Sequence, residues 1–136
     1  MMGQKPFIWP SRVRFGDTDA SGRIFYVSLL RHFDAAEAEF LRSLGCGYRE
    51  IQTAMTAFPR VRVECDYISA LVYDDLMQIA VTVDRVGRAS FTLAFAVSVD
   101  GREAARGKVT VATMDRVAQK AVALPEKLAS ALKAAQ

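Results

Sequence analysis

The spacing of hydrophobic residues predicts one long helix in the first half of the chain. In residues 28–44, apolar side chains recur every three, four or seven positions, which is the period of one face of an α-helix. Gly45 and Gly47 follow directly and are expected to end this helix. The pattern therefore predicts an amphipathic helix with one face turned to a core.

Alternation of polar and apolar residues predicts strands in the rest of the chain, each with one wet and one buried face. The alternating segments are residues 12–15, 60–67, 77–85, 90–99 and 104–114. Asp100-Gly101 is typical of a hairpin turn and predicts that the last two strands are antiparallel neighbours. Pro125 is expected to open a short C-terminal helix that extends through Leu132.

This order of elements predicts an α+β fold with one long central helix against a five-stranded antiparallel curved sheet. Residues 1–136 are expected to form a single domain, because the chain has no linker and 51% of it is hydrophobic. Such a sheet has two unpaired edges, and one helix covers only part of one face. We therefore expect pairing with a second copy, as a homodimer or a dimer of dimers.

Composition narrows the classes of function. The net charge is +3, but the basic residues are scattered, so no nucleic-acid partner is expected. The sequence has neither a bilayer-length apolar run nor a signal peptide, which predicts a cytoplasmic protein without a membrane partner. Cys46 and Cys65 lack metal-ligand spacing and are expected to be reduced core residues. No metal and no cofactor are expected.

Candidate chemistry lies in residues 16–22, where every residue is small or turn-forming. Asp17 and Asp19 lie there, a few residues before the long helix, where free N–H groups and the positive end of the helix dipole gather. A carboxylate at such a place can cap a turn or take part in catalysis. The residues alone leave both interpretations open.

Residues 15–26, FGDTDASGRIFY, resemble the signature loop of the 4-hydroxybenzoyl-CoA thioesterase family. The resemblance covers roughly residues 10–115 and continues in three further segments, which are residues 31–36, 73–76 and 88–91. It implies the hotdog fold. It also implies that the chain is an enzyme, an acyl-CoA thioesterase that hydrolyses 4-hydroxybenzoyl-CoA or a related aromatic acyl-CoA to the free acid and coenzyme A.

The resemblance implies a role for each matched residue of the loop. Asp19 is the expected catalytic carboxylate, as a nucleophile or as a general base for water. The backbone N–H of Tyr26 is expected to hold the developing oxyanion. Gly22 is expected to keep the backbone clear of the acyl group, while Asp17 and Thr18 fix the loop through hydrogen bonds.

The acyl pocket is less well defined by the resemblance. Asp34 matches a residue that contacts the ring hydroxyl of the aroyl group, although a solvated helix residue is the alternative. Leu29 and His32 stand where the family has bulky aromatics, and Phe58 replaces a small polar residue. The acyl pocket is therefore expected to differ in shape from that of the family. We expect His32 to be a packing or surface residue and not the partner of Asp19.

For the coenzyme A phosphates, the resemblance points to a hairpin that carries Arg88 and Ser90. Basic residues on neighbouring strands are alternatives: Arg60, Arg62, Arg106 and Lys108. Two other functions stay open, an acyl-carrier-protein thioesterase and a non-catalytic acyl-CoA binding module, and the presence of Asp19 argues against the second. A hotdog hydratase would need its own Asp and His motif, which is absent from the sequence.

Overall fold

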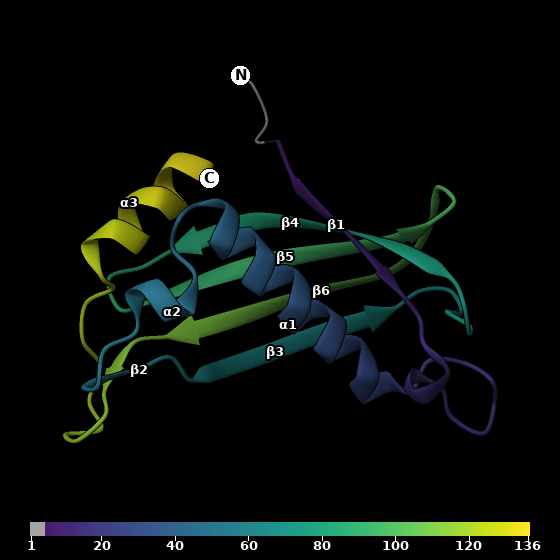
Figure 1. Cartoon of the computed structure of the whole chain (residues 1–136), viewed down its shortest axis with the longest axis horizontal. Coiled ribbons are helices and arrows are strands. Elements are labelled where there is room, and N and C mark those ends of the chain that lie inside the picture. The colour runs from purple at the N-terminus through teal and green to yellow at the C-terminus, as the bar shows by residue number, and fades with distance from the viewer. Residues whose placement is uncertain (1–4) are drawn as a thin grey trace.

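A computed structural model describes residues 5–136 and shows a long helix across one face of an antiparallel sheet (Figure 1). The elements in chain order are β1 (Phe7–Arg12), the 3-10 helix η1 (Phe15–Asp17), α1 (Tyr26–Ser43), α2 (Tyr48–Ile51), β2 (Thr56–Ala57), β3 (Arg60–Tyr67), β4 (Leu76–Val86), β5 (Ser90–Val99), β6 (Arg102–Ala112), β7 (Met114–Asp115) and α3 (Glu126–Ala135). The five-stranded sheet has the order β1-β4-β5-β6-β3, and every pairing is antiparallel. β1 and β3 are therefore its edges.

The structure confirms the α+β class, the five-stranded antiparallel sheet and the C-terminal helix, α3. The prediction of a first strand at residues 12–15 is wrong, because β1 ends at Arg12 and Phe15–Asp17 form η1. The short elements α2, β2 and β7 were not predicted, since two to four residues are too few for a period to show.

β3 does not have the buried face that its alternation predicts. Val61 and Val63 are 60% and 47% exposed, and Tyr67 is 46% exposed. The reason is its place at the edge of the sheet, where one side has no neighbouring strand in the chain. Cys65 is for the same reason only half-buried, whereas Cys46 is buried as predicted, and both are free thiols.

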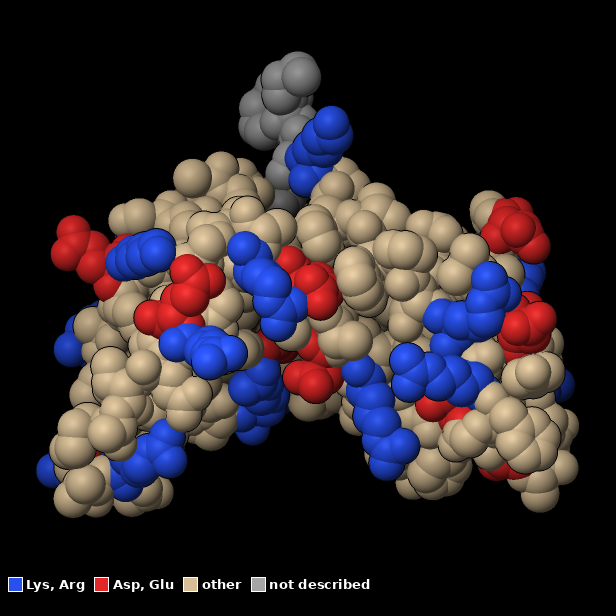
Figure 2. All heavy atoms as spheres, viewed as in Figure 1, with Lys and Arg blue, Asp and Glu red and all other residues tan. Residues whose placement is uncertain are grey.

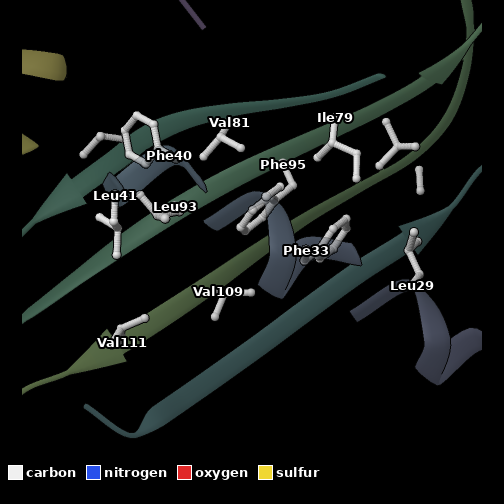
Figure 3. Close-up of a cluster of buried hydrophobic side chains, with 14 of the residues drawn as sticks. Leu29, Phe33, Phe40, Leu41, Ile79, Val81, Leu93, Phe95, Val109 and Val111 are labelled. Carbon is white, nitrogen blue, oxygen red and sulfur yellow. The ribbon is translucent and has the colours of Figure 1, made fainter. Parts of the chain in front are cut away.

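α1 is anchored to the sheet by Phe33. Its ring stacks on Phe95 of β5 with centroids 4.6 Å apart and planes 7° from parallel, at the centre of the buried cluster in Figure 3. The same ring lies over Gly107 of β6, where a Cβ would be 2.6 Å from Cε2 of Phe33. Gly107 thus allows the helix its close approach to the sheet.

Replacing Gly107 with alanine should destabilise the fold. The new methyl group would also lie 2.8 Å from the carbonyl oxygen of Glu64, so α1 and β3 would both have to shift. We expect a loss of roughly 1–3 kcal/mol in the free energy of unfolding, measured by urea denaturation. Gly16→Ala is the control, because nothing lies within 4 Å of its added Cβ. Equal effects of both changes would contradict this packing role.

Candidate active site

The side chain of Asp19 is exposed on the loop between η1 and α1. Its Oδ1 accepts hydrogen bonds from Ser21, at 2.8 Å from the backbone N–H and 2.5 Å from the hydroxyl. These two bonds lower the pKa of Asp19 below its ordinary value of 3.8. The charge and the backbone N–H of the nearby Arg23 lower the pKa further, while the hydrogen bonds from Ser21 all go to Oδ1 and leave Oδ2 open. The loop therefore presents an ionised carboxylate with one oxygen free for chemistry.

Two backbone hydrogen bonds and a glycine shape this turn. The N–H of Asp19 donates to the carbonyl of Arg23 at 2.9 Å, and the N–H of Gly22 donates to the carbonyl of Asp19 at 3.0 Å. Gly22 has φ +85°, in the left-handed region that favours glycine. A Cβ there would meet nothing within 4 Å, so within this chain backbone conformation, not space, requires the glycine.

Tyr26 is the first residue of α1, and its backbone N–H points out of the helix end. The first hydrogen bond of the helix is made by Ser28, which donates to the carbonyl of Phe25 at 2.8 Å. The N–H groups of Tyr26 and Val27 precede it and have no intrahelical acceptor. Among residues 5–136, the helix start thus offers two backbone donors without an acceptor, at the positive end of its dipole.

The helix start is held from two sides. The N–H of Phe25 donates to the carbonyl of Asp17 at 2.7 Å, which ties α1 to the loop. The hydroxyl of Tyr67 on β3 donates to the carbonyl of Tyr26 at 2.5 Å. Burial, together with Cys65, raises the pKa of Tyr67 to about 12, so this hydroxyl remains a donor at neutral pH. Tyr26 is fixed while its N–H stays available.

His32 has a partner that the sequence did not reveal. The side chain is 6% exposed, its Nε2 lies 2.8 Å from Oδ2 of Asp17, and its Nδ1 lies 2.6 Å from Oγ of Ser11. The same Asp17 oxygen accepts the N–H of Arg14 at 2.8 Å. These bonds connect β1, the loop and α1. The loop-fixing role predicted for Asp17 is confirmed, and Thr18 shares it through a 2.7 Å bond to the carbonyl of Phe15.

Ser11, His32 and Asp17 follow the order of a hydrolase triad, yet their surroundings differ from an active site. The chain has hollows with volumes of about 470, 390, 210 and 110 Å³, and none of these four is lined by Ser11 or His32. Ser11 faces the helix from an edge strand. We therefore assign these three residues a structural role, which is to hold the loop in place.

A hollow of about 110 Å³ lies between α1 and β3, the flank on which Asp34 is exposed. Its lining residues come from α1, β3 and β6: Leu30, Phe33, Asp34, Glu37, Arg60, Val63 and Val109. Glu37 is only 2% exposed and was not singled out from the sequence. Its Oε2 accepts the hydroxyl of Tyr48 at 2.7 Å and is ion-paired with Arg60. Two carboxylates thus face one small apolar hollow.

The largest of these four hollows, about 470 Å³, lies on the other face of the sheet and does not include Asp19. A hollow of about 210 Å³, lined by Arg23, Ile24 and Tyr67–Leu71, adjoins the loop instead. Within residues 5–136, no group of three or more His, Cys, Asp or Glu side chains could hold a metal ion. Over the same residues, no helix is long and apolar enough to cross a membrane.

Residues 13–132 match the family described as the thioesterase-like superfamily. The chain belongs to this superfamily. It is 29% identical over 126 residues to the acyl-CoA thioesterase YbgC of Haemophilus influenzae, covering 92% of this chain and 93% of that protein. It is 26% identical over 124 residues to the 1,4-dihydroxy-2-naphthoyl-CoA hydrolase of Prochlorococcus marinus, covering 85% of this chain and 80% of that one.

Among solved structures, the gentisyl-coenzyme A thioesterase BH1999 superposes with a TM-score of 0.84 at 27% identity, covering 93% of this chain and 99% of that one. The hotdog fold expected from the sequence is confirmed, and the protein is a thioester hydrolase. The resemblance to the 4-hydroxybenzoyl-CoA branch in particular stays a prediction.

In this hotdog thioesterase, the predicted coenzyme A residues lie far from Asp19. The loop adjoins the start of β4, where the N–H of Val13 donates to the carbonyl of Asp75 at 2.9 Å. Arg88 and Ser90 lie past the other end of β4, which is 11 residues long and so spans about 35 Å. One chain therefore does not bring them to Asp19.

Each alternative basic residue already has an acidic partner. The pairs are Arg60–Glu37, Arg62–Glu64 at 3.7 Å, Arg106–Glu103 at 2.9 Å and Lys108–Asp84 at 3.3 Å. Figure 2 shows the same mixing, with Lys and Arg side chains among Asp and Glu on the face in view. Arg88 is exposed and forms no ion pair within residues 5–136. Of the basic candidates, Arg88 is thus the one whose charge is most available to a phosphate.

The Asp17–His32 contact predicts how stability of this thioesterase depends on pH. Burial alone would raise the pKa of Asp17, but the bonds from Arg14 and His32 outweigh it and hold the pKa below 3.8. A lowered folded-state pKa stabilises the protein above the unfolded-state value, and this stabilisation is lost as pH falls through the folded-state pKa. The stability advantage over Asp17→Asn should thus be constant above about pH 5 and shrink under more acidic conditions.

Urea denaturation of both proteins across this range measures the advantage. In a His32→Leu background it should be smaller, because one of the groups that favour the Asp17 carboxylate is gone. Identical pH dependence in the wild type and Asp17→Asn would contradict the assignment.

Proposed function

We propose that the protein hydrolyses an aromatic acyl-CoA thioester, with Asp19 as the catalytic carboxylate and the N–H of Tyr26 as the oxyanion donor. The observation that carries the proposal is an exposed, ionised Asp19 on a loop hydrogen-bonded to the start of α1, where that N–H is free. Acyl transfer needs both groups at one place. The named activities of the Haemophilus and Prochlorococcus relatives, both on CoA thioesters, support the substrate class.

The free oxygen of Asp19 starts the reaction by either of two routes. In one, it attacks the thioester carbon, the C–S bond breaks with departure of the coenzyme A thiolate, and water hydrolyses the mixed anhydride. In the other, it removes a proton from water, whose oxygen attacks the same carbon. Negative charge develops on the carbonyl oxygen in both routes. The Tyr26 N–H and the helix dipole stabilise that charge.

The position of Asp34 suits an aromatic acyl group. Tyr26, Leu30 and Asp34 are spaced four residues apart and so share one flank of α1. Eight residues of helix rise about 12 Å, and a hydrogen bond of about 3 Å at each end leaves about 6 Å, the span of one ring with its substituents. Asp34 then accepts a ring hydroxyl while the Tyr26 N–H holds the carbonyl.

A second copy of the chain completes the site in this proposal. The edge strand β3 exposes Val61, Val63 and Tyr67 beside the open flank of α1. An antiparallel partner on β3 covers these side chains and brings the opposite end of its own sheet, with Arg88 and Ser90, toward Asp19. The phosphates of coenzyme A then meet a basic residue of the partner.

The assignment of Asp19 is tested by exchanging each loop aspartate for asparagine. Asp19→Asn should lower the single-turnover rate with benzoyl-CoA by at least about a hundredfold and leave substrate affinity nearly unchanged, because the carboxylate acts in the transition state. Asp17→Asn is the control and should mainly destabilise the loop. A larger loss of rate in Asp17→Asn would reverse the two roles.

The shared site is tested by charging the exposed edge. Val61→Glu on β3 should convert the protein to a monomer in sedimentation velocity and reduce turnover at least about tenfold, because buried unpaired charge opposes association. Ile8→Glu on β1 is a matched control, since Ile8 is 48% exposed on the opposite edge strand. A fully active Val61→Glu monomer would refute the shared site.

A further inference from the structure

The buried carboxylate Glu37 has an oxygen that the fold does not use. Its Oε2 takes both the Tyr48 hydroxyl and the Arg60 guanidinium, whereas its Oε1 has no hydrogen-bond partner within residues 5–136. The side chain is 2% exposed and lines the hollow between α1 and β3. Oε1 is not among the fully buried side-chain atoms without a partner, so it opens onto the hollow, where water or a ligand can donate to it.

The groups around Glu37 hold it in this orientation. Tyr48 of α2 and Arg60 at the start of β3 approach the same oxygen, and the Arg60 guanidinium also lies 5.0 Å from the centre of the Tyr48 ring. Burial raises the pKa of Glu37, while Arg60 and Tyr48 oppose that rise, so a donor at the other oxygen would further favour the ionised carboxylate. The other oxygen is left for a ligand.

The hollow also has a definite charge. Asp34 and Glu37 are negative and Arg60 is positive, which leaves one net negative charge beside apolar walls from Leu30 and Val109. Such a site favours a neutral donor, for example a hydroxyl, and disfavours an acyl group that ends in a carboxylate.

Measured along α1 from Tyr26, where the thioester carbonyl is proposed to bind, Glu37 lies further away than Asp34. It is three residues further along the same flank of α1, a rise of about 4.5 Å. Helical side chains lean toward the N-terminus, and glutamate is one methylene longer than aspartate, so its carboxylate lies somewhat nearer than the rise suggests. The extra distance from Tyr26 to the Glu37 carboxylate, compared with Asp34, matches the length that a second fused ring adds to the acyl group.

We infer that Glu37 is a second recognition group of the acyl site, and that it selects aromatic acyl groups whose far end carries a hydrogen-bond donor beyond the reach of Asp34, such as a hydroxynaphthoyl group. This inference rests on the proposed acyl-CoA hydrolysis. The donor O–H of the acyl group bonds to Oε1 of Glu37, and Oε2 keeps its two protein partners. Glu37 is thus a specificity residue that stays away from the reacting bond.

The test compares four synthetic substrates: 6-hydroxy-2-naphthoyl-CoA, 2-naphthoyl-CoA, 4-hydroxybenzoyl-CoA and benzoyl-CoA. In the wild type, the hydroxynaphthoyl thioester should have the higher kcat/KM of the naphthoyl pair. Glu37→Gln places a donor or a neutral acceptor at the hollow and should lower kcat/KM for hydroxynaphthoyl-CoA roughly ten- to a hundredfold, but for 2-naphthoyl-CoA less than about threefold. Asp34→Asn should instead act on 4-hydroxybenzoyl-CoA relative to benzoyl-CoA.

Tyr48→Phe is the matched control. It removes one hydrogen bond from the same carboxylate, outside the hollow, and leaves Oε1 in place. It should lower stability while preserving the preference for the hydroxynaphthoyl substrate. If Glu37→Gln fails to fold, Glu37→Gln with Arg60→Met removes both charges of the buried pair and is expected to fold. The same loss of preference is expected in this double variant.

The outcomes separate the two proposals. Equal losses of Glu37→Gln on both naphthoyl substrates would make Glu37 a purely structural residue and overturn the inference. A wild type that hydrolyses benzoyl-CoA in an Asp19-dependent way without preferring hydroxynaphthoyl-CoA would also overturn it, while the proposed function stands. No turnover of any of the four substrates would refute the proposed aromatic acyl-CoA hydrolysis itself, and this inference with it.

Discussion

The contact of Phe33 with Phe95 and Gly107 is the constraint on which the rest of the structure depends. It fixes how close α1 lies to the sheet and how the helix is rotated about its axis. Once Phe33 faces the sheet, His32 must point to the β1 flank, where it meets Asp17 and Ser11. Asp34 and Glu37 must then turn to the β3 flank. The packed ring of Phe33 thus separates the flank of α1 that holds the loop from the flank that lines the hollow beside β3.

Three carboxylates near α1 have the same chemistry but differ in their surroundings, and these surroundings determine what each can do. Asp17 is buried but receives donors from Arg14 and His32, so it stays ionised and structural. Asp19 is exposed and its carboxylate accepts hydrogen bonds from Ser21 through Oδ1, which lower its pKa and keep it ionised at neutral pH. Glu37 is buried deeply enough that its pKa rises despite an arginine. Solvent access and the number of donors thus distinguish the structural role of Asp17 from the roles proposed for Asp19 and Glu37.

The sequence predicted the features that follow a period or a turn signal. The helical period places α1 to within two residues at its start, and alternation finds β4, β5 and β6. Asp100-Gly101 forms the expected hairpin with positive φ at both residues. The Asp19 loop was recognisable because its small residues come directly before the helix. Each of these signals is local, so a short stretch of chain contains it whole.

What the sequence did not reveal depends on contacts between distant segments. His32 and Ser11 are 21 residues apart and meet only because β1 runs beside α1. Glu37 did leave a local trace, a charged residue at the spacing of Phe33 and Phe40 on the buried face, but its partners Tyr48 and Arg60 are set by tertiary packing. The exposure of β3 was missed because alternation describes the two faces of a strand and says nothing of its edges.

The open β3 flank joins these observations. A sheet that ended in a covered strand would bury Val63 and close the hollow at Asp34 and Glu37, whereas an edge strand leaves both within reach of a second chain or a substrate. The proposed catalytic and phosphate-binding residues lie about 35 Å apart in one chain, so in the proposal they serve one substrate only if two copies pair head to tail along that flank. The unpaired edge that makes an isolated chain prone to association is, in the proposed dimer, also the edge along which the two parts of the site come together.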